Sequence, residues 1–122
     1  MFRLKVTSSF SAAHKLEGYA GDCCNLHGHN WRVQVVIRCK EQDNIGLTID
    51  FREVKTRLNR VISEVDHKYL NDLDCFQGKN PTSEELARHL FHRLVAVFEE
   101  LSGEVDEVEI WESDSSSVVY SE

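Results

Sequence analysis

Three histidines carry the strongest chemical signal in the chain. His27 and His29 are separated by one glycine, and His14 ends an earlier segment whose residues alternate between apolar and polar. Alternate side chains of a strand point the same way, so His27 and His29 can reach one metal ion, and His14 can join them from a neighbouring strand. Three neutral imidazoles and one open position are typical of a catalytic zinc rather than a structural one. The sequence therefore predicts a zinc site at these three histidines, because a ligand set without carboxylates disfavours magnesium and calcium.

A thiol close to these histidines is a candidate for proton transfer. Cys23 precedes His27 by four residues, in a segment with several turn-forming glycines. The thiolate is the reactive form of cysteine, and a nearby zinc ion would favour it. Alternatively, Cys23 or Cys24 is itself a metal ligand and closes a structural site, although a Cys-x3-His-x-His spacing differs from the common structural spacings. The residues alone leave both interpretations open.

The adjacent pair Asp66 and His67 follows a segment with helical periodicity. His67 can transfer protons near neutral pH, and Asp66 can orient or polarise a neighbouring imidazole. The alternative is purely structural, with His67 as a cation at a helix C-terminus and Asp66 as a capping residue. Both alternatives remain open from the sequence.

Glu112 is a charged residue in an apolar pattern. It continues the alternation of Val108 and Ile110, where an uncompensated charge would be costly. A ligand with two adjacent N–H donors would satisfy both carboxylate oxygens, and the amino-pyrimidinone edge of a pterin or guanine has such donors. Alternatively the strand ends at Trp111 and Glu112 points to water.

The periodicities predict the elements that position these residues. Strands are expected at 2–15, 29–40, 104–112 and 116–121, and a loop at 17–28. One helix is expected after Asp50 as N-cap, with an apolar stripe from Phe51 to Val65, and a second from Thr82 to about 102, with Thr82 and Glu85 forming a capping box. The order ββααββ predicts a single α+β domain, residues 1–122, in which two helices cover one face of a four-stranded antiparallel sheet.

Composition limits the class of protein. The 122 residues carry a formal charge of -7 and include 41% hydrophobic residues, enough for one domain with a core. The chain has no basic patch, which argues against nucleic acid as a partner. No apolar run approaches the roughly 20 residues that a membrane-spanning helix needs, so no membrane partner and a cytoplasmic location are expected.

Six short motifs together resemble the 6-pyruvoyl-tetrahydropterin synthase family. They are Phe-Ser-Ala-Ala-His at 10–14, Cys-x3-His-Gly-His-Asn at 23–30, Asp-Phe at 50–51, Asp-His-x-Tyr-Leu-Asn at 66–71, Asn-Pro-Thr-Ser-Glu at 80–84 and Glu-Ser at 112–113. The resemblance covers essentially the whole chain, and this order of motifs is highly specific. The three residues between Cys23 and His27 resemble the bacterial 6-carboxy-tetrahydropterin synthases of queuosine biosynthesis, because the animal pyruvoyl enzyme typically has a longer spacer.

The resemblance implies a function and a set of roles. The implied fold is the tunnelling fold, in which subunits join their sheets into a barrel and two rings stack into a homo-hexamer with active sites between subunits. The implied substrate is 7,8-dihydroneopterin triphosphate, and the implied products are 6-carboxy-5,6,7,8-tetrahydropterin, acetaldehyde and triphosphate. The implied roles are zinc binding by His14, His27 and His29, proton transfer by Cys23 with Asp66 and His67, and pterin binding by Glu112 with Thr82 and Ser83 near the same edge.

Two other functions compete with this one. A 6-pyruvoyl-tetrahydropterin synthase would act on the same substrate without cleaving its side chain. A non-catalytic zinc-binding module, with Cys23 as the fourth ligand, belongs to a different class.

Overall fold

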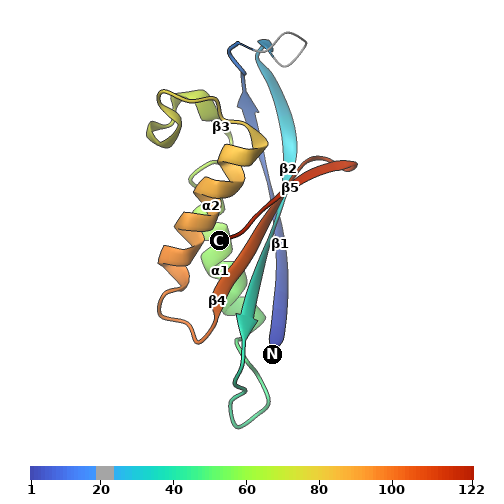
Figure 1. Cartoon of the computed structure of the whole chain (residues 1–122), viewed down its shortest axis with the longest axis vertical. Coiled ribbons are helices and arrows are strands. Elements are labelled where there is room, and N and C mark those ends of the chain that lie inside the picture. Colours follow the sequence, from blue (N-terminus) through green and yellow to red (C-terminus); the bar gives the residue numbers. More distant parts are fainter. Residues whose placement is uncertain (19–23) are drawn as a thin grey trace.

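The computed structural model describes residues 1–18 and 24–122, in which two α-helices lie on one side of a long twisted sheet (Figure 1). The first two strands form a long hairpin. The helices cover the part of it near the N-terminus, and its other end extends past them (Figure 1). The elements in chain order are β1 (Phe2–His14), β2 (His27–Cys39), α1 (Phe51–Ile62), β3 (Lys68–Tyr69), η2 (Leu70–Asp72), η3 (Asp74–Phe76), α2 (Ser83–Phe98), β4 (Glu104–Ser113) and β5 (Ser116–Tyr120).

The described part of the chain forms a five-stranded sheet in the order β3-β1-β2-β4-β5. The four expected strands are present and pair antiparallel. The expected number of strands was wrong by one, because Lys68 and Tyr69 add a short strand parallel to β1 at Ala12 and Ala13. Two residues are too few to show an alternation in the sequence. The α+β class is correct, and the order of elements becomes ββαβαββ.

The hairpin of β1 and β2 brings the predicted metal ligands together. Its register runs from Phe2 opposite Cys39 to His14 opposite His27. The β2 strand starts at His27, two residues before the expected position, so both of its histidines lie in regular strand. On the helix side this hairpin buries an apolar row that ends in the histidines: Leu4, Val6, Phe10, Ala12, Trp31, Val33, Val35 and Ile37.

The N-caps of both helices are confirmed. Asp50 accepts a hydrogen bond from the backbone N–H of Arg52 at 2.8 Å, and the Thr82 hydroxyl accepts one from the backbone N–H of Glu85 at 3.1 Å. The reciprocal half of the expected capping box is missing, because the Glu85 carboxylate pairs with Arg88 at 2.7 Å. The helices also end earlier than expected, at Ile62 and Phe98.

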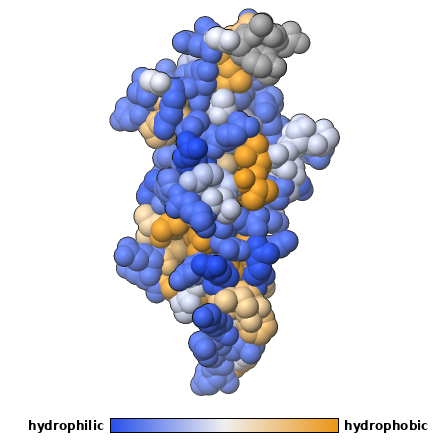
Figure 2. Space-filling view, in the orientation of Figure 1, coloured by the Kyte–Doolittle hydropathy of each residue, from blue (hydrophilic) through white to orange (hydrophobic). Residues whose placement is uncertain are grey.

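Not all apolar residues of the predicted stripes are buried. Phe51 was expected to face the core, but 54% of it is exposed, and Phe2 is 45% exposed. Together with Leu47 they line a depression of about 550 Å³ at the N-terminal end of the sheet. Figure 2 shows a mostly hydrophilic face with separate hydrophobic patches.

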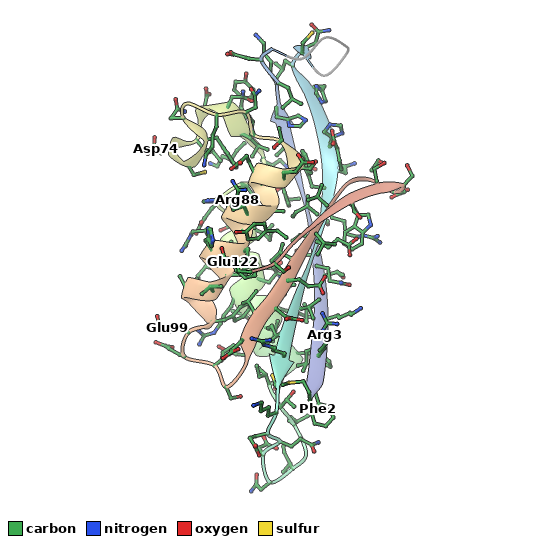
Figure 3. The ribbon with its side chains drawn as sticks, in the orientation of Figure 1. Phe2, Arg3, Asp74, Arg88, Glu99 and Glu122 are labelled. Atoms are coloured by element: carbon green, nitrogen blue, oxygen red, sulfur yellow. The ribbon has the colours of Figure 1, made fainter. Side chains whose placement is uncertain are left out.

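The last residues of the chain pack against α2. The Nε2 atom of His92 lies 2.6 Å from a carboxylate oxygen of Glu122, and the Tyr120 hydroxyl donates to the same oxygen. Figure 3 shows Arg88 of α2 and Glu122 near one another. None of the described helices is long and apolar enough to span a membrane.

Candidate metal centre

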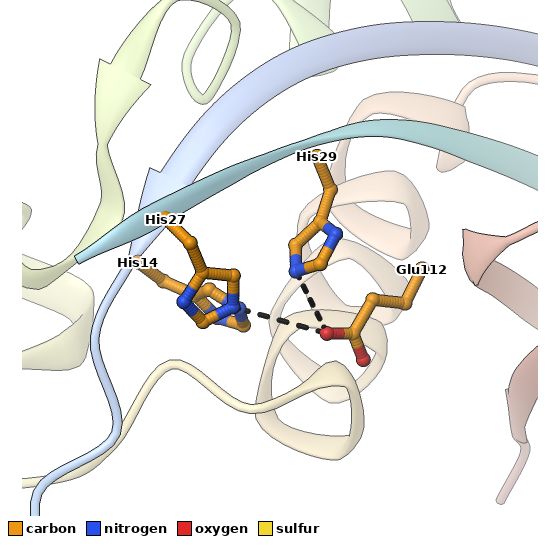
Figure 4. A group of neighbouring side chains, drawn as sticks. All are labelled: His14, His27, His29 and Glu112. Carbon is orange, nitrogen blue, oxygen red and sulfur yellow. Dashed lines mark hydrogen bonds and ion pairs between the residues drawn. The ribbon is translucent and has the colours of Figure 1, made fainter. Parts of the chain in front are cut away.

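Three imidazoles meet where β1 ends and β2 begins (Figure 4). The Nε2 atoms of His14 and His27 are 3.0 Å apart, and the ring of His29 lies 5.2 Å and 4.7 Å from those two rings, centroid to centroid. The His14 side chain is 1% exposed, so it lies beneath the other two. The structure thus brings together the three histidines that strand alternation placed on one face.

Backbone carbonyls determine which nitrogen of two rings carries the proton. The Nδ1 atom of His14 lies 2.8 Å from the carbonyl oxygen of Pro81, and the Nδ1 atom of His27 lies 2.7 Å from that of Asn25. A carbonyl oxygen can only accept, so each Nδ1 donates a hydrogen, and in the neutral rings both Nε2 atoms present lone pairs. Two lone pairs that face each other at 3.0 Å repel unless a proton or a metal cation lies between them. This arrangement fits a bound cation.

The third ring also fits a metal. Among the described residues, the Nε2 atom of His29 is buried without a hydrogen bond of acceptable geometry, although it lies 2.8 Å from a carboxylate oxygen of Glu112. Burial lowers the pKa of His29, and Glu112 opposes this shift while His14 and His27 add to it. The ring is therefore favoured in its neutral form, which is the form that binds metals.

A carboxylate joins the three imidazoles. The Oε1 atom of Glu112 lies 2.8 Å from His29 Nε2 and 3.7 Å from His14 Nε2, and its Oε2 atom accepts a hydrogen bond from the Ser83 hydroxyl at 3.1 Å (Figure 4). The strand continues to Ser113, so Glu112 faces the helix side and not the solvent side of the sheet. Glu112 therefore lies within the donor cluster, beside the three histidines expected as ligands.

The four donor atoms are close enough for one ion. They all lie within 4.8 Å of one another, and this is the cluster found in the described part of the chain. Ligands about 2.0–2.1 Å from a tetrahedral zinc would be about 3.3–3.4 Å apart, which lies between the shortest and longest of these separations. Nitrogen and carboxylate donors are also the types that zinc binds. The residues present therefore fit a metal ion of the size and ligand preference of zinc.

The pair Asp66 and His67 lies at the outer edge of β1, beside β3. The Asp66 carboxylate accepts from the backbone N–H of Ser11 at 3.0 Å and lies 2.9 Å from Nδ1 of His67, which in turn donates its backbone N–H to the Ser11 carbonyl at 2.6 Å. The hydrogen bond from Ser11 is the main reason that the pKa of Asp66 is lowered. His67 has a φ of 57°, an uncommon value for a non-glycine residue, and 82% of its side chain is exposed. Asp66 therefore holds an exposed imidazole in place, on a residue whose backbone adopts the left-handed conformation.

This pair does not face the imidazoles of its own chain. His67 borders a shallow depression of about 480 Å³ whose other walls include Ser11, Ala13 and Asn30, and which His29 also borders. Those three residues alternate with His14 and His29 along β1 and β2, so their side chains project from the opposite face of the sheet. The structure therefore brings together the predicted metal ligands, and among the described residues no hydrogen bond or ion pair joins Asp66 or His67 to them.

The other predicted site residues are Cys23, Ser83 and Thr82. Cys23 lies outside the described residues, and the neighbouring Cys24 is half-buried. Ser83 contacts Glu112, whereas the Thr82 hydroxyl is engaged in capping α2. The sequence reasoning missed the proximity of Glu112 to the imidazoles, and also the backbone carbonyls that fix the rings.

Comparison with known proteins gives a consistent result. Residues 3–122 match the family described as 6-pyruvoyl tetrahydropterin synthase. A 6-carboxy-5,6,7,8-tetrahydropterin synthase of Haemophilus influenzae is 32% identical, with all of both chains covered, and a 6-pyruvoyl tetrahydrobiopterin synthase of Dictyostelium discoideum is 32% identical over 91% of this chain and 89% of the relative. The solved structure of the 6-pyruvoyl tetrahydropterin synthase of Caenorhabditis elegans superimposes with a TM-score of 0.89 at 29% identity, and the match covers 99% of this chain and 95% of the other. The chain therefore belongs to the 6-pyruvoyl tetrahydropterin synthase family.

Proposed function

We propose that the chain is a zinc-dependent 6-carboxy-5,6,7,8-tetrahydropterin synthase. Its substrate would be 7,8-dihydroneopterin triphosphate, and its products 6-carboxy-5,6,7,8-tetrahydropterin, acetaldehyde and triphosphate. The observation that carries this proposal is the convergence of His14, His27 and His29, with two of their tautomers fixed by backbone carbonyls. The Cys23-x3-His27 spacing favours the 6-carboxy product.

The alternative product is 6-pyruvoyl-tetrahydropterin. It is a real competitor, because similar proteins carry both names. Both activities would use the same metal and the same pterin pocket, and they differ in whether the carbon–carbon bond of the side chain is broken.

Each residue has a distinct task in the proposed mechanism. His14, His27 and His29 would hold zinc, which when bound supplies a Lewis acid that polarises oxygens of the substrate side chain. The Cys23 thiolate would take a proton from a side-chain carbon and return it to another position. The Glu112 carboxylate would accept two N–H groups of the pterin ring, and Ser83 and Thr82 would lie near the same edge.

Asp66 and His67 would complete the proton relay in the site of a neighbouring subunit. Within one chain neither residue contacts the cluster of imidazoles, and an inter-subunit site would bring such a pair to it. In the described residues, β1 is paired along its outer edge only at Ala12 and Ala13, which leaves backbone groups available for pairing with another copy. This edge supports association between copies of the chain, and we propose the homo-hexamer, a dimer of trimers, that the family resemblance implies. We also propose a cytoplasmic location.

The decisive experiment incubates the zinc-loaded protein with 7,8-dihydroneopterin triphosphate and measures the product masses. The expected result is 6-carboxy-5,6,7,8-tetrahydropterin together with acetaldehyde. A pyruvoyl product without acetaldehyde would support the alternative enzyme, and an unchanged substrate would contradict both. Light scattering should give about 85 kDa for six chains of 14.1 kDa.

Replacing one cysteine distinguishes the enzyme hypothesis from the hypothesis of a non-catalytic zinc-binding module. In Cys23→Ala, turnover should be lost while zinc stoichiometry and folding remain. Cys24→Ala is the matched control, and we expect it to retain both activity and zinc. If Cys23→Ala loses its zinc, Cys23 is a ligand of a structural site and the catalytic assignment is wrong.

A further inference from the structure

Glu112 has two assignments that one carboxylate cannot fulfil at the same time. The proposed function needs both of its oxygens for the N–H groups of the pterin ring. In the structure, however, Oε1 lies among the imidazole nitrogens, and Oε2 is held by Ser83 at 3.1 Å. The carboxylate is therefore in a position to bind the metal, and Oε1 would have to turn away from the imidazoles before both oxygens could accept from a pterin.

The contacts of Glu112 are those of a metal ligand. Its Oε1 atom lies 2.8 Å from Nε2 of His29 and 3.7 Å from Nε2 of His14. Together with His27, these residues offer four donor atoms to one ion. The Oε2 atom is held by a hydroxyl, as outer-shell groups commonly hold ligating carboxylates. The side chain is 33% exposed, so it has room to move, unlike the 1% exposed His14.

We infer that Glu112 is the fourth metal ligand when no substrate is bound, and that the pterin ring displaces it. This inference rests on the proposed function and goes beyond it. In the resting enzyme the site is closed by three imidazoles and one carboxylate. When the ring takes both oxygens of Glu112, the carboxylate leaves the metal and one coordination position opens.

Exchange of this ligand couples ring recognition to chemistry. The open position becomes available to the hydroxyls of the substrate side chain only after the correct ring has been bound. Ser83 is a positioning residue in this account, because it holds the second oxygen of Glu112 and so directs the first one towards the metal. A molecule without the amino-pyrimidinone edge would leave the site closed.

The first measurement is zinc affinity without substrate, by competition with a chromogenic chelator. Glu112→Gln keeps the shape of the side chain but removes the charged donor, and it should weaken zinc binding by about 10-fold or more, in the range known for losses around metal sites. Ser83→Ala removes a group that only holds the ligand, so it should weaken binding less than Glu112→Gln does, by about 10-fold at the low end of the range for such groups. Circular dichroism of each variant checks that the fold is retained.

The sheet offers a matched control pair. Glu109 lies on the same strand but on the opposite face, and its carboxylate accepts a hydrogen bond from the Ser117 hydroxyl at 2.7 Å. Glu109→Gln and Ser117→Ala therefore remove the same chemical groups far from the imidazoles. Both variants should bind zinc with the wild-type affinity.

The second measurement follows the displacement itself. Co²⁺ replaces zinc in the wild-type protein, and its visible absorption changes with the number and kind of ligands. The probe is 6-methylpterin, which has the amino-pyrimidinone edge but no side-chain hydroxyl. Its binding, followed by its own fluorescence, should change the cobalt spectrum saturably in the wild type and in Glu109→Gln.

The outcomes distinguish this inference from the proposed function. If the wild type binds no zinc or no pterin, the proposed function fails. If the wild type binds both but Glu112→Gln holds zinc equally well, Glu112 is not a ligand and the inference is wrong. If Glu112→Gln loses affinity but bound pterin leaves the cobalt spectrum unchanged, Glu112 is a permanent ligand and the exchange is refuted.

Discussion

Replacing Asn71 by alanine tests how the metal site is anchored to the rest of the fold. The Asn71 amide clamps the backbone of Lys15, the residue after His14. Its Oδ1 atom accepts from the Lys15 N–H at 2.9 Å, and its Nδ2 atom donates to the Lys15 carbonyl at 2.8 Å. These bonds imitate strand pairing and continue the support that β3 gives to β1. Without them, the backbone next to His14 would lose its partner.

The magnitude follows from the two hydrogen bonds. Each contributes a net of about 1 kcal/mol, so Asn71→Ala should lower the free energy of unfolding by about 2 kcal/mol. The unfolding entropy of a chain of 122 residues is about 0.26 kcal/mol/K, so the melting temperature should fall by about 8 °C. Because Lys15 adjoins His14, zinc affinity should also fall.

The assay is urea unfolding at one protein concentration, with a chelator present so that metal binding does not add to stability. Asn80→Ala is the matched control, since Asn80 clamps Glu17 with the same two bonds at 2.9 Å and 2.8 Å, but at an exposed position. Asn80→Ala should lower the free energy of unfolding by less than about 1 kcal/mol. The reasoning is refuted if Asn71→Ala stays within about 0.5 kcal/mol of the wild type, or if the exposed clamp proves the stronger one.

Two further substitutions test the packing and the electrostatics. In Gly103→Ala the new Cβ would lie 2.6 Å from both the sulfur of Cys39 and a methyl carbon of Ile37. This overpacking should lower the free energy of unfolding, measured with urea, by about 1–3 kcal/mol. An unchanged urea midpoint would show that the neighbouring side chains adjust without loss of stability. The pKa of Asp66 is held below its ordinary value of 3.8, chiefly by the hydrogen bond from the Ser11 N–H. The ionised Asp66 carboxylate therefore stabilises the fold at pH values above 3.8, and this stabilisation is lost as the pH falls through the pKa of the folded state. Asp66→Asn should therefore lower stability at pH 7 and match the wild type in strong acid, whereas a difference that persists in acid would contradict this cause.

The convergence of the three histidines was predictable because it depends on local regularities. Alternation along two strands placed His14, His27 and His29 on one face, and those strands pair with each other from Phe2–Cys39 to His14–His27. The caps at Asp50 and Thr82 were predictable for the same reason, since each depends on residues within three positions.

Features that depend on register or on longer-range packing could not be predicted. Glu112 approaches His29 because Arg32 of β2 pairs with Trp111 of β4, and alternation says nothing about which residues of two distant strands lie opposite each other. The strand at 68–69 was missed because two residues have no periodicity. Phe51 was expected inside because its spacing fits the stripe, but it lies at the first turn of α1, beyond the edge of the core.

X-ray absorption spectroscopy of the zinc-loaded protein tests the central claim most directly. The account predicts one zinc per chain, surrounded by three imidazole nitrogens at about 2.0–2.1 Å and one oxygen at about 2.0–2.2 Å. Binding of the pterin substrate should leave the three imidazoles in place. A sulfur neighbour at about 2.3 Å would show that a cysteine closes the site, and the three-histidine catalytic centre proposed for this chain would then be wrong.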